Sequence, residues 1–558
     1  MPALSIIDAA MFVLETPERP FNIGPLIMLD PPARGRATFA DRLVTQMLKR
    51  PPGVPFSYKL RMQPLGLPTL EVDPNADVAA HVHRITLAAP GSFQQLSKLV
   101  CELHEKRLDR SKLLWELYVI DGLEGGKVAL YGKTHHGIID GRGFVQAISG
   151  WLATSATDTT VRAMWEGVSR PAQEGPVRKS VAGRLGSVLG LVKGTAASAV
   201  GLYAMLARQS LKTLGVGGFK SLSLPYTRVP RALGGKASSK RSFAYCTLPV
   251  REMKAFGKAH GCTLNDLLLT TVDMALARYL EEQGKRPKGA LITAMPVALA
   301  AASGGNQIAV LQFPLGSPGL SPEKRLAAVR AETATVKSVI EKSTNEVVML
   351  YTTLVHGVPA MVEKAGLKTG LPISNLMISN PFGFAEPRYL MGAAVEMVLP
   401  VSVVPAGQLL NVTSVSLADR FQIGFLAMPE AVPEIEKVAR YTTEAFDELK
   451  RSMSKDTVAS VVAEAPAVAQ TPPPARRAAR PRPAKAMTAA PRGRAPAKRS
   501  KRTALVEVGE ATAAAAAAAV AAVASAAVAQ TVEVVEALQA AQSQGGQAPH
   551  REAESVAA

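Results

Sequence analysis

The stretch from Tyr131 to Phe144 constrains the fold of this 558-residue chain most strongly; it reads Tyr-Gly-Lys-Thr-His-His-Gly-Ile-Ile-Asp-Gly-Arg-Gly-Phe. The apolar residues 128–131 predict a strand that runs into two histidines, and Asp-Gly four residues after the second histidine opens a helix-like pattern. Histidine can take and return a proton near neutral pH. The stretch therefore predicts a reactive group on a strand-to-helix turn, although two histidines beside an aspartate can also form a purely structural turn.

Length and composition set the broad class of the protein. With 558 residues, 47% of them hydrophobic and 20% charged, the chain can bury a large core and should form more than one domain. The three cysteines show no paired spacing, which indicates a reducing compartment and no metal site. The first residues lack a basic region followed by an apolar core, so we expect a cytoplasmic protein without a secretory signal.

The formal net charge of +19 is divided between the body of the chain and its C-terminal tail. Eleven Lys and Arg and no acidic residue lie between Arg476 and Arg502, among Pro and Ala. This run is expected to be disordered, and the alanine-rich residues 511–542 to be helical. The tail is a candidate anchor to membrane phosphates or to nucleic acid, and the basic body suits a phosphate-bearing ligand such as CoA or an anionic membrane.

A second motif opens the chain, as Leu-Ser-x-x-Asp-Ala-x-x-Phe-x-x-Glu-Thr-Pro-x-x-Pro-x-x-x-Gly from Leu4 to Gly24. The pattern His-His-x-x-x-Asp-Gly resembles the signature of the CoA-dependent acyltransferase superfamily, which includes chloramphenicol acetyltransferase and the condensation domains of peptide synthetases. The opening motif is similar to that of the bacterial wax ester synthase/diacylglycerol acyltransferase family, and is more specific. The resemblance covers residues 4–453, with a gap in the linker.

The chain also departs from the family pattern. Leu113 replaces a proline in the segment 108–116, and Lys59 stands where the family carries arginine. In the family's Asn-Val-Pro-Gly-Pro turn only Asn380 and Gly383 match. These departures leave room for a degenerate site, whereas the intact histidine motif argues against one.

The resemblance implies an α/β (α+β) fold of two chloramphenicol-acetyltransferase-like mixed-sheet domains around a central channel, followed by a disordered and alanine-rich tail. The expected divisions are an N-terminal domain over 1–165, a linker over 166–240, a C-terminal domain over 241–453 and a low-complexity tail over 454–558. Within the linker, residues 185–207 are apolar but contain Lys193 and several glycines. We expect them to form a helix that rests on a bilayer or packs on the domains rather than one that spans a membrane.

The resemblance also implies roles for the residues of the first motif. His136 is expected to be the general base, and His135 to line the site or orient its neighbour. Asp140 is expected to fix the loop by pairing with a cation, for which Lys59 is the candidate, and Gly141 to permit the turn.

A third segment, Thr263-Leu-Asn-Asp266, precedes a strongly apolar helix that should end near Glu282. Thr263 and Asp266 fit a capping box, which explains Asp266 as structural support. Asn265 would lie in the first helical turn and matches an Asn-Asp motif of the family. Its amide is therefore a candidate to bind an oxyanion.

The function implied is an O-acyltransferase that moves a long-chain acyl group from acyl-CoA to diacylglycerol or a long-chain alcohol, without a cofactor, metal or covalent intermediate. Such a protein would lie peripherally on the inner face of the membrane or on lipid inclusions. Two alternatives remain at this point: a noncatalytic lipid-droplet protein with a degenerate site, and a condensation-type acyltransferase that forms amides.

Overall fold

The computed structural model describes residues 4, 6–62, 68–139, 141–167, 198, 200–213, 222, 224–225, 227, 229–235, 237–299, 308–364, 373–381 and 383–464. The chain divides into a unit of residues 1–453, which carries the fold considered below, and a unit of residues 454–558. Three sequence predictions fall outside the described residues. They concern Asp140, the first part of the helix expected over 185–207, and the low-complexity tail beyond residue 464.

The first sheet is mixed, and its described strands follow the order β11-β12-β1-β6-β5-β4. They are β1 (Asn22–Asp30), β4 (Val82–Thr86), β5 (Trp115–Asp121), β6 (Val128–His135), β11 (Tyr389–Leu390) and β12 (Ala393–Val401). β4 and β5 run parallel, and the other neighbours run antiparallel. Every residue of β6 is buried, because both faces of the sheet are covered and both edges of β6 are paired.

The second sheet is also mixed, with the order β7-β14-β13-β10-β8-β9 among the described strands. They are β7 (Ser242–Pro249), β8 (Ile292–Ala298), β9 (Ile308–Pro314), β10 (Leu376–Ser379), β13 (Leu410–Leu417) and β14 (Arg420–Ala427). β10 runs parallel to both of its neighbours. A separate hairpin pairs β2 (Tyr58–Arg61) with β3 (Thr69–Val72).

The helices are distributed over two lobes. The first lobe, built on the first sheet, carries α1 (Ile6–Leu14), α2 (Phe39–Met47), α3 (Phe93–Glu105) and α4 (Gly141–Trp151). The second lobe, built on the second sheet, carries α6 (Val250–His260), α7 (Leu264–Glu282), α8 (Pro322–Glu341), α9 (Asn345–Lys364) and α10 (Ile435–Glu464). Residues 200–213 form a further helix. None of the helices in the described part of the chain is long and apolar enough to cross a membrane.

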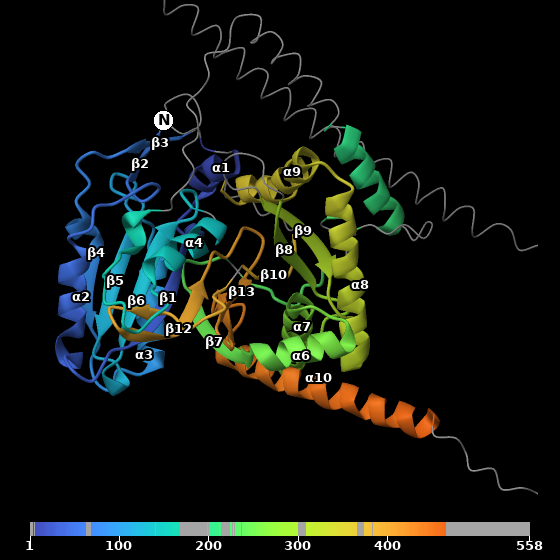
Figure 1. Ribbon diagram of the computed structural model, residues 1–558. Helices are drawn as coiled ribbons and strands as arrows, with labels where there is room; N and C mark the ends of the chain where they lie inside the picture. The colour runs from blue at the N-terminus through green and yellow to red at the C-terminus, as the bar shows by residue number, and fades with distance from the viewer. Residues whose placement is uncertain are drawn as a thin grey trace, which may run out of the picture. The chain divides into compact units, whose positions relative to one another are not determined.

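Strand β12 comes from the second half of the sequence but belongs to the sheet of the first lobe. It pairs antiparallel with β1, from Gly24 opposite Val401 to Asp30 opposite Ala394. Figure 1 shows this orange strand beside the blue strand β1. The second half of the chain is therefore not self-contained, and the boundaries predicted at 165 and 240 stay predictions.

The two lobes also share an apolar core. Val100 of α3 and Tyr131 of β6 belong to the same buried cluster as Leu268 and Phe425 of the second lobe. The Ser97 hydroxyl of α3 donates a 2.8 Å hydrogen bond to the carbonyl of Phe243 on β7. A second cluster fills the opposite face of the first sheet, under α1, α2 and α4. The first sheet therefore packs against helices of its own lobe on one face and against the second lobe on the other.

Candidate active site

The histidine pair lies where β6 leaves the first sheet. The backbone N–H of His135 donates to the Leu114 carbonyl over 2.9 Å, and that of His136 donates to the Phe21 carbonyl over 2.8 Å. The chain then turns, with the Ile138 N–H bonded to the His135 carbonyl, and α4 starts at Gly141. The predicted strand-to-helix turn is therefore present, and the backbones of both histidines are fixed by neighbouring segments.

The imidazole of His135 is buried and held in one orientation. It stacks on the ring of Phe12 with centroids 4.0 Å apart and planes 4° apart. Its Nδ1 accepts a 3.0 Å hydrogen bond from the Gly137 N–H. Burial lowers the pKa of His135 well below its ordinary value, and the nearby Arg110 and His136 lower it further. His135 is therefore a neutral imidazole at neutral pH, with its proton on Nε2.

His136 differs from its neighbour in exposure. Its side chain is half-buried, whereas that of His135 is 1% exposed. A general base must reach the proton that it abstracts, so it needs at least partial access to substrate. Of the two histidines, His136 is the one with such access.

A buried carboxylate lies beside the pair. Glu15 Oε1 accepts the Phe21 N–H over 3.0 Å and lies 3.7 Å from His135 Nε2. Its other oxygen accepts a 2.8 Å hydrogen bond from Arg110, whose guanidinium also donates to the Phe12 carbonyl. The opening helix α1 is thus fastened to the segment before β5, with one charged pair next to the histidines.

Strand β6, which leads into the histidine pair, also carries a buried lysine. Lys133 is 1% exposed, and its Nζ lies 3.2 Å from Glu116 Oε2, which also accepts the Tyr118 hydroxyl proton. Burial lowers the pKa of Lys133. The ion pair with Glu116 nevertheless satisfies the ammonium in this buried position.

His104 links α3 to β6 and to the segment after β12 in a neutral form. Its Nδ1 lies 2.6 Å from the Tyr131 hydroxyl, and its Nε2 lies 2.9 Å from the Ser402 carbonyl. Because a carbonyl only accepts, Nε2 carries the proton and Tyr131 donates to Nδ1. Burial, with smaller effects of Arg241 and Lys133, lowers the pKa of His104 to about 3.

The second predicted group of residues lies on the second lobe. Thr263 and Asp266 form the predicted capping box at the start of α7, and Asp266 also accepts the Thr333 hydroxyl proton over 2.7 Å. The Asn265 amide nitrogen lies 3.5 Å from the sulfur of Met295 on β8. The capping box and the bond from Thr333 explain why Asp266 is present. They do not explain Asn265.

Lys59, the candidate partner of Asp140, is occupied elsewhere. Its Nζ lies 2.6 Å from Asp73 Oδ2 beyond the β2–β3 hairpin. Asp140 itself lies outside the described residues, so their pairing stays a prediction. Lys59 also forms a main-chain bridge with Leu113, whose side chain is 2% exposed. The residue that replaces the family's proline is thus a core residue of the first lobe.

The glycines of the motif have different surroundings from those that the sequence suggested. A Cβ added at Gly141 would meet nothing within 4 Å among the described atoms, so these residues give no steric reason for glycine there. A Cβ at Gly137 would lie 2.5 Å from Phe12 Cε2 and 3.0 Å from His135 Nδ1. Gly137, to which the sequence analysis gave no role, is therefore the glycine that admits the Phe12 ring beside His135.

Asn380 and Gly383, which match the family's turn, both have packing explanations. Asn380 Oδ1 accepts the Ser414 hydroxyl proton over 3.0 Å. A Cβ at Gly383 would lie 2.1 Å from Ser416 Oγ and 2.3 Å from the Ser416 carbonyl oxygen. Both residues therefore support the segment after the end of β10 against β13.

Phe12, Glu15 and Arg110 are the neighbours of the pair that the sequence analysis did not single out. Phe12 lies in the last turn of α1, and Glu15 follows that helix directly, three residues later. That spacing was visible in the opening motif, but served there only as a mark of the family. The long-range position of Arg110 has no comparable signal in the sequence.

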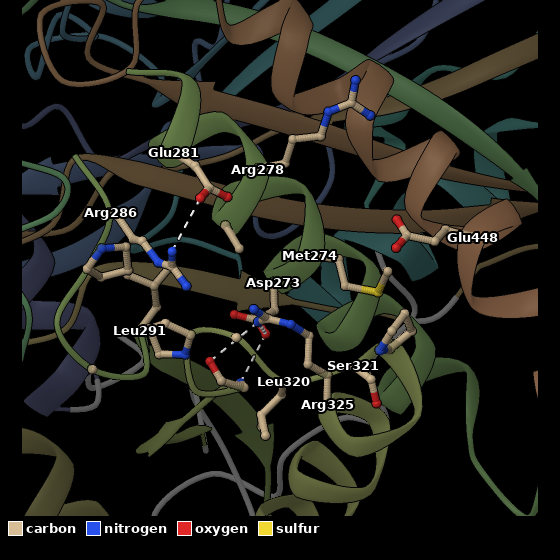
Figure 2. A pocket seen from close by; sticks show the side chains of 17 residues that line it. Asp273, Met274, Arg278, Glu281, Arg286, Leu291, Leu320, Ser321, Arg325 and Glu448 are labelled. Atoms are coloured by element: carbon tan, nitrogen blue, oxygen red, sulfur yellow. Dashed lines mark hydrogen bonds and ion pairs between the residues drawn. The ribbon is translucent and has the colours of Figure 1, made fainter. Parts of the chain in front are cut away.

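A cavity in the second lobe includes none of the predicted site residues. It has a volume of about 470 Å³ and opens between α7, α8 and the loops before β8 and α8. Figure 2 shows Arg325 directed at Asp273 and Arg286 at Glu281, so these lining charges are paired with each other. Because the cavity lies in the second lobe and these charges are paired, it has no visible part in chemistry at the histidines. Within the described part of the chain, no cluster of His, Cys, Asp and Glu is suited to a metal ion.

The molecule has two mixed sheets, and β12 from the second half of the chain joins the first of them. The histidine pair lies at the exit of a central strand of that sheet. These features define the class as the two-lobed acyltransferase fold. The solved wax ester synthase/diacylglycerol acyltransferase from Marinobacter aquaeolei VT8 shares this fold, with a TM-score of 0.60 at 22% identity; the match covers 81% of this chain and 100% of that one.

Two family domains match the sequence itself. Residues 4–268 match the wax ester synthase/diacylglycerol acyltransferase catalytic domain, and residues 304–450 match the C-terminal domain of the same family. The probable diacylglycerol O-acyltransferase Tgs4 of Mycobacterium tuberculosis is 31% identical over 461 residues, which are 81% of this chain and 97% of that protein. A putative diacylglycerol O-acyltransferase of the same organism is 30% identical over 463 residues, 81% of this chain and all of the relative.

The chain therefore belongs to the wax ester synthase/diacylglycerol acyltransferase family and is an acyltransferase. The predicted family, fold class and enzyme class are confirmed.

Proposed function

We propose that this enzyme transfers a long-chain acyl group from acyl-CoA to the hydroxyl of diacylglycerol or of a long-chain alcohol, with His136 as the general base. The observation that carries the proposal is the unequal pair on one turn. His135 is buried, stacked and neutral, whereas His136 is half-buried on a backbone fixed by Phe21.

The reaction divides into two proton transfers at one imidazole. His136 takes the proton of the acceptor hydroxyl while its oxygen attacks the thioester carbonyl, and a tetrahedral oxyanion forms. The oxyanion collapses, the carbon–sulfur bond breaks, and the imidazolium returns the proton to the CoA sulfur. General-base assistance of this kind contributes about 10²–10⁴-fold to the rate. Because a thiol with a pKa of about 8.5 leaves readily, the step requires no acyl-enzyme.

Asn265 is the proposed donor to the oxyanion. Its amide nitrogen donates to the thioether sulfur of Met295 over 3.5 Å. A thioether sulfur is a weak acceptor, so exchanging this contact for an oxyanion would cost little. Its position in the first turn of α7 adds the positive end of the helix dipole.

The substrates are proposed from the relatives and from hydrophobic energetics. Two relatives are described as probable or putative diacylglycerol O-acyltransferases, and the Marinobacter structure as a wax ester synthase/diacylglycerol acyltransferase. Each buried methylene of an acyl chain contributes about 0.8 kcal/mol, so long chains would supply much of the binding energy.

The proposed location is a cytoplasmic membrane surface or lipid inclusion, where such acceptors reside. Support comes from apolar side chains that face solvent. Val200 and Tyr203, on the helix 200–213, are 69% and 66% exposed, and Met62 beside the β2–β3 hairpin is 55% exposed. The basic run 476–502 would add attraction to anionic lipid. Binding of the same run to nucleic acid is the competing outcome, and vesicle and nucleic-acid pull-downs would separate the two.

The test supplies purified protein with labelled palmitoyl-CoA and each acceptor in turn. His136→Ala should abolish transfer while acyl-CoA binding and the circular dichroism spectrum are kept, and His135→Ala should retain a measurable fraction. His83→Ala is the matched control, because it removes a half-buried histidine that packs on Tyr118 in the same lobe. Full activity of His136→Ala, or a trapped palmitoylated protein, would contradict the mechanism. Product formed only with amines would favour the condensation-type alternative.

A further inference from the structure

We propose that Glu15 is a positioning residue of the acyltransferase site, one that sets the place of the histidine pair from the end of the opening helix. This inference rests on the proposed role of His136 as the base. It adds a function for the opening motif, which nothing in the chemistry of the transfer itself requires.

The first link runs through the main chain. Glu15 Oε1 accepts the N–H of Phe21 over 3.0 Å, and the carbonyl of Phe21 accepts the N–H of His136 over 2.8 Å. The carboxylate of Glu15 and the backbone of the proposed base are therefore joined through a single residue. A displacement of this carboxylate shifts the residue that holds His136 in place.

The second link runs through the neighbouring ring. Glu15 Oε1 lies 3.7 Å from His135 Nε2, the nitrogen that carries the proton. Phe12, one helical turn before Glu15, stacks on the same imidazole at 4.0 Å. The Gly137 N–H on Nδ1 and the Phe12 ring hold His135 in place, and the Glu15 carboxylate faces its Nε2 without a hydrogen bond. The end of α1 and the residue after it thus surround the ring next to His136 in the sequence.

The carboxylate of Glu15 is both buried and paired with a cation. Its side chain is 1% exposed, and Arg110 binds its second oxygen over 2.8 Å. A buried carboxylate without a partner is strongly unfavourable, and Arg110 supplies that partner. The other charged or titratable groups near by are His136 and the ion pair of Lys133 with Glu116. A structural anchor for α1 alone would require neither the contact with His135 nor the link to His136.

The electrostatic consequence has a definite sign. A negative charge near an imidazole favours the imidazolium and raises its pKa. In Glu15→Gln the charge is removed, while the amide oxygen can still accept the Phe21 N–H. The unbalanced Arg110 then acts in the same direction. The acid limb of the kcat/KM profile, where the base becomes protonated, should therefore move to lower pH.

The experiment compares the full-length enzyme with Glu15→Gln, Glu15→Ala and Asp273→Asn, using palmitoyl-CoA and a long-chain alcohol in detergent. Glu15→Gln should lower kcat about 10- to 100-fold, the scale expected for slight misplacement of a catalytic group, and leave the KM for acyl-CoA within about twofold. Glu15→Ala should lower kcat further, because it also frees Phe21. If Glu15→Ala fails to fold, Glu15→Gln carries the test.

Asp273→Asn is the matched control. Asp273, 2% exposed, is a similarly buried carboxylate that pairs with a guanidinium, Arg325, but in the second lobe. This variant should lose stability and keep the acid limb at its wild-type pH. An unshifted acid limb and wild-type kcat in Glu15→Gln would overturn the inference, as would an equal shift in Asp273→Asn.

The two proposals can fail separately. Full activity of His136→Ala would remove the proposed base whatever Glu15 does. An inactive His136→Ala together with a wild-type Glu15→Gln would reject the positioning role alone. A readout without turnover supports the separation, since the His136 imidazole, assigned in ¹⁵N-histidine spectra by its loss in His136→Ala, should titrate at lower pH in Glu15→Gln.

Discussion

Replacing Gly137 by alanine should force apart the two stacked rings behind the proposed base. The new methyl group would lie 2.5 Å from Phe12 Cε2, 2.9 Å from Phe12 Cζ and 3.0 Å from His135 Nδ1. Carbon atoms in contact normally lie about 3.5–4.0 Å apart, so one ring has to move by roughly 1 Å. Phe12 is 1% exposed and has no empty space to enter without displacing the core.

The expected cost follows from this overlap. Overpacking of a core by one methyl group lowers the free energy of unfolding by about 1–3 kcal/mol. A shift of about 1 Å in a catalytic constellation can lower the rate up to roughly 100-fold. Gly137→Ala should therefore lower both the urea midpoint and kcat, measured as CoA thiol release from palmitoyl-CoA with a long-chain alcohol.

A second substitution tests the cause. Phe12→Leu removes the ring atoms that the methyl group would strike, so Gly137→Ala should cost less in that background. The two changes should couple by about 0.5–3 kcal/mol, as for residues in contact. Gly150→Ala, on the exposed side of α4 with nothing within 4 Å of the added Cβ, is the control and should stabilise by about 0.5–1 kcal/mol. Additive effects of Phe12→Leu and Gly137→Ala would refute the explanation.

Four further predictions follow. Asn265→Ala should lower kcat about 10- to 1000-fold with little change in melting temperature, and a parallel loss of stability would favour a structural role. Truncation after Ser454 should leave transfer in detergent nearly intact and weaken flotation with anionic vesicles; loss of detergent activity would place the tail in the catalytic fold. Gly24→Ala should prevent stable folding in a solubility assay, because its Cβ would lie 2.2 Å from the Gly132 carbonyl oxygen on β6. The pKa of His104 is about 3 in the folded protein and about 6.5 when unfolded, so only the unfolded state gains its proton as pH falls below about 6.5. The free energy of unfolding should drop by about 2 kcal/mol for this residue between pH 7 and 5, and His104→Gln should reduce that slope in urea titrations.

Elements with local signals could be predicted from the sequence. The helix after the Thr263 capping box ends at the predicted Glu282, and helix α8 starts with a proline at its first position, Pro322. A cap, a proline at the first helical position and helical periodicity each depend on a few neighbouring residues. They can therefore be recognised in the sequence. Helix α9 was not predicted; Gly357 and Pro359 lie inside it, and both lower helix propensity.

Long-range pairing could not be predicted in the same way. The strand β12 lies within the residues expected to form the C-terminal domain, but it pairs in the sheet of the first lobe. An alternating apolar pattern indicates a strand and its faces, but it does not name the partner at the edge. Pairing with β1, more than 360 residues earlier, depends on how the two lobes close on each other. The sequence pattern alone therefore does not show which sheet such a strand joins.

The site shows the same division between local and distant information. The histidine pair and the capping box were each visible as short motifs, and both occur where their local patterns indicate. The environment that separates the two histidines is not local, because Phe12, Glu15 and Arg110 reach His135 from segments 25 to 123 residues away. A motif can thus identify two chemically equivalent imidazoles, but their exposure and charge environment are products of the fold. That difference, and not the sequence of the pair, makes His136 rather than His135 the base to be tested.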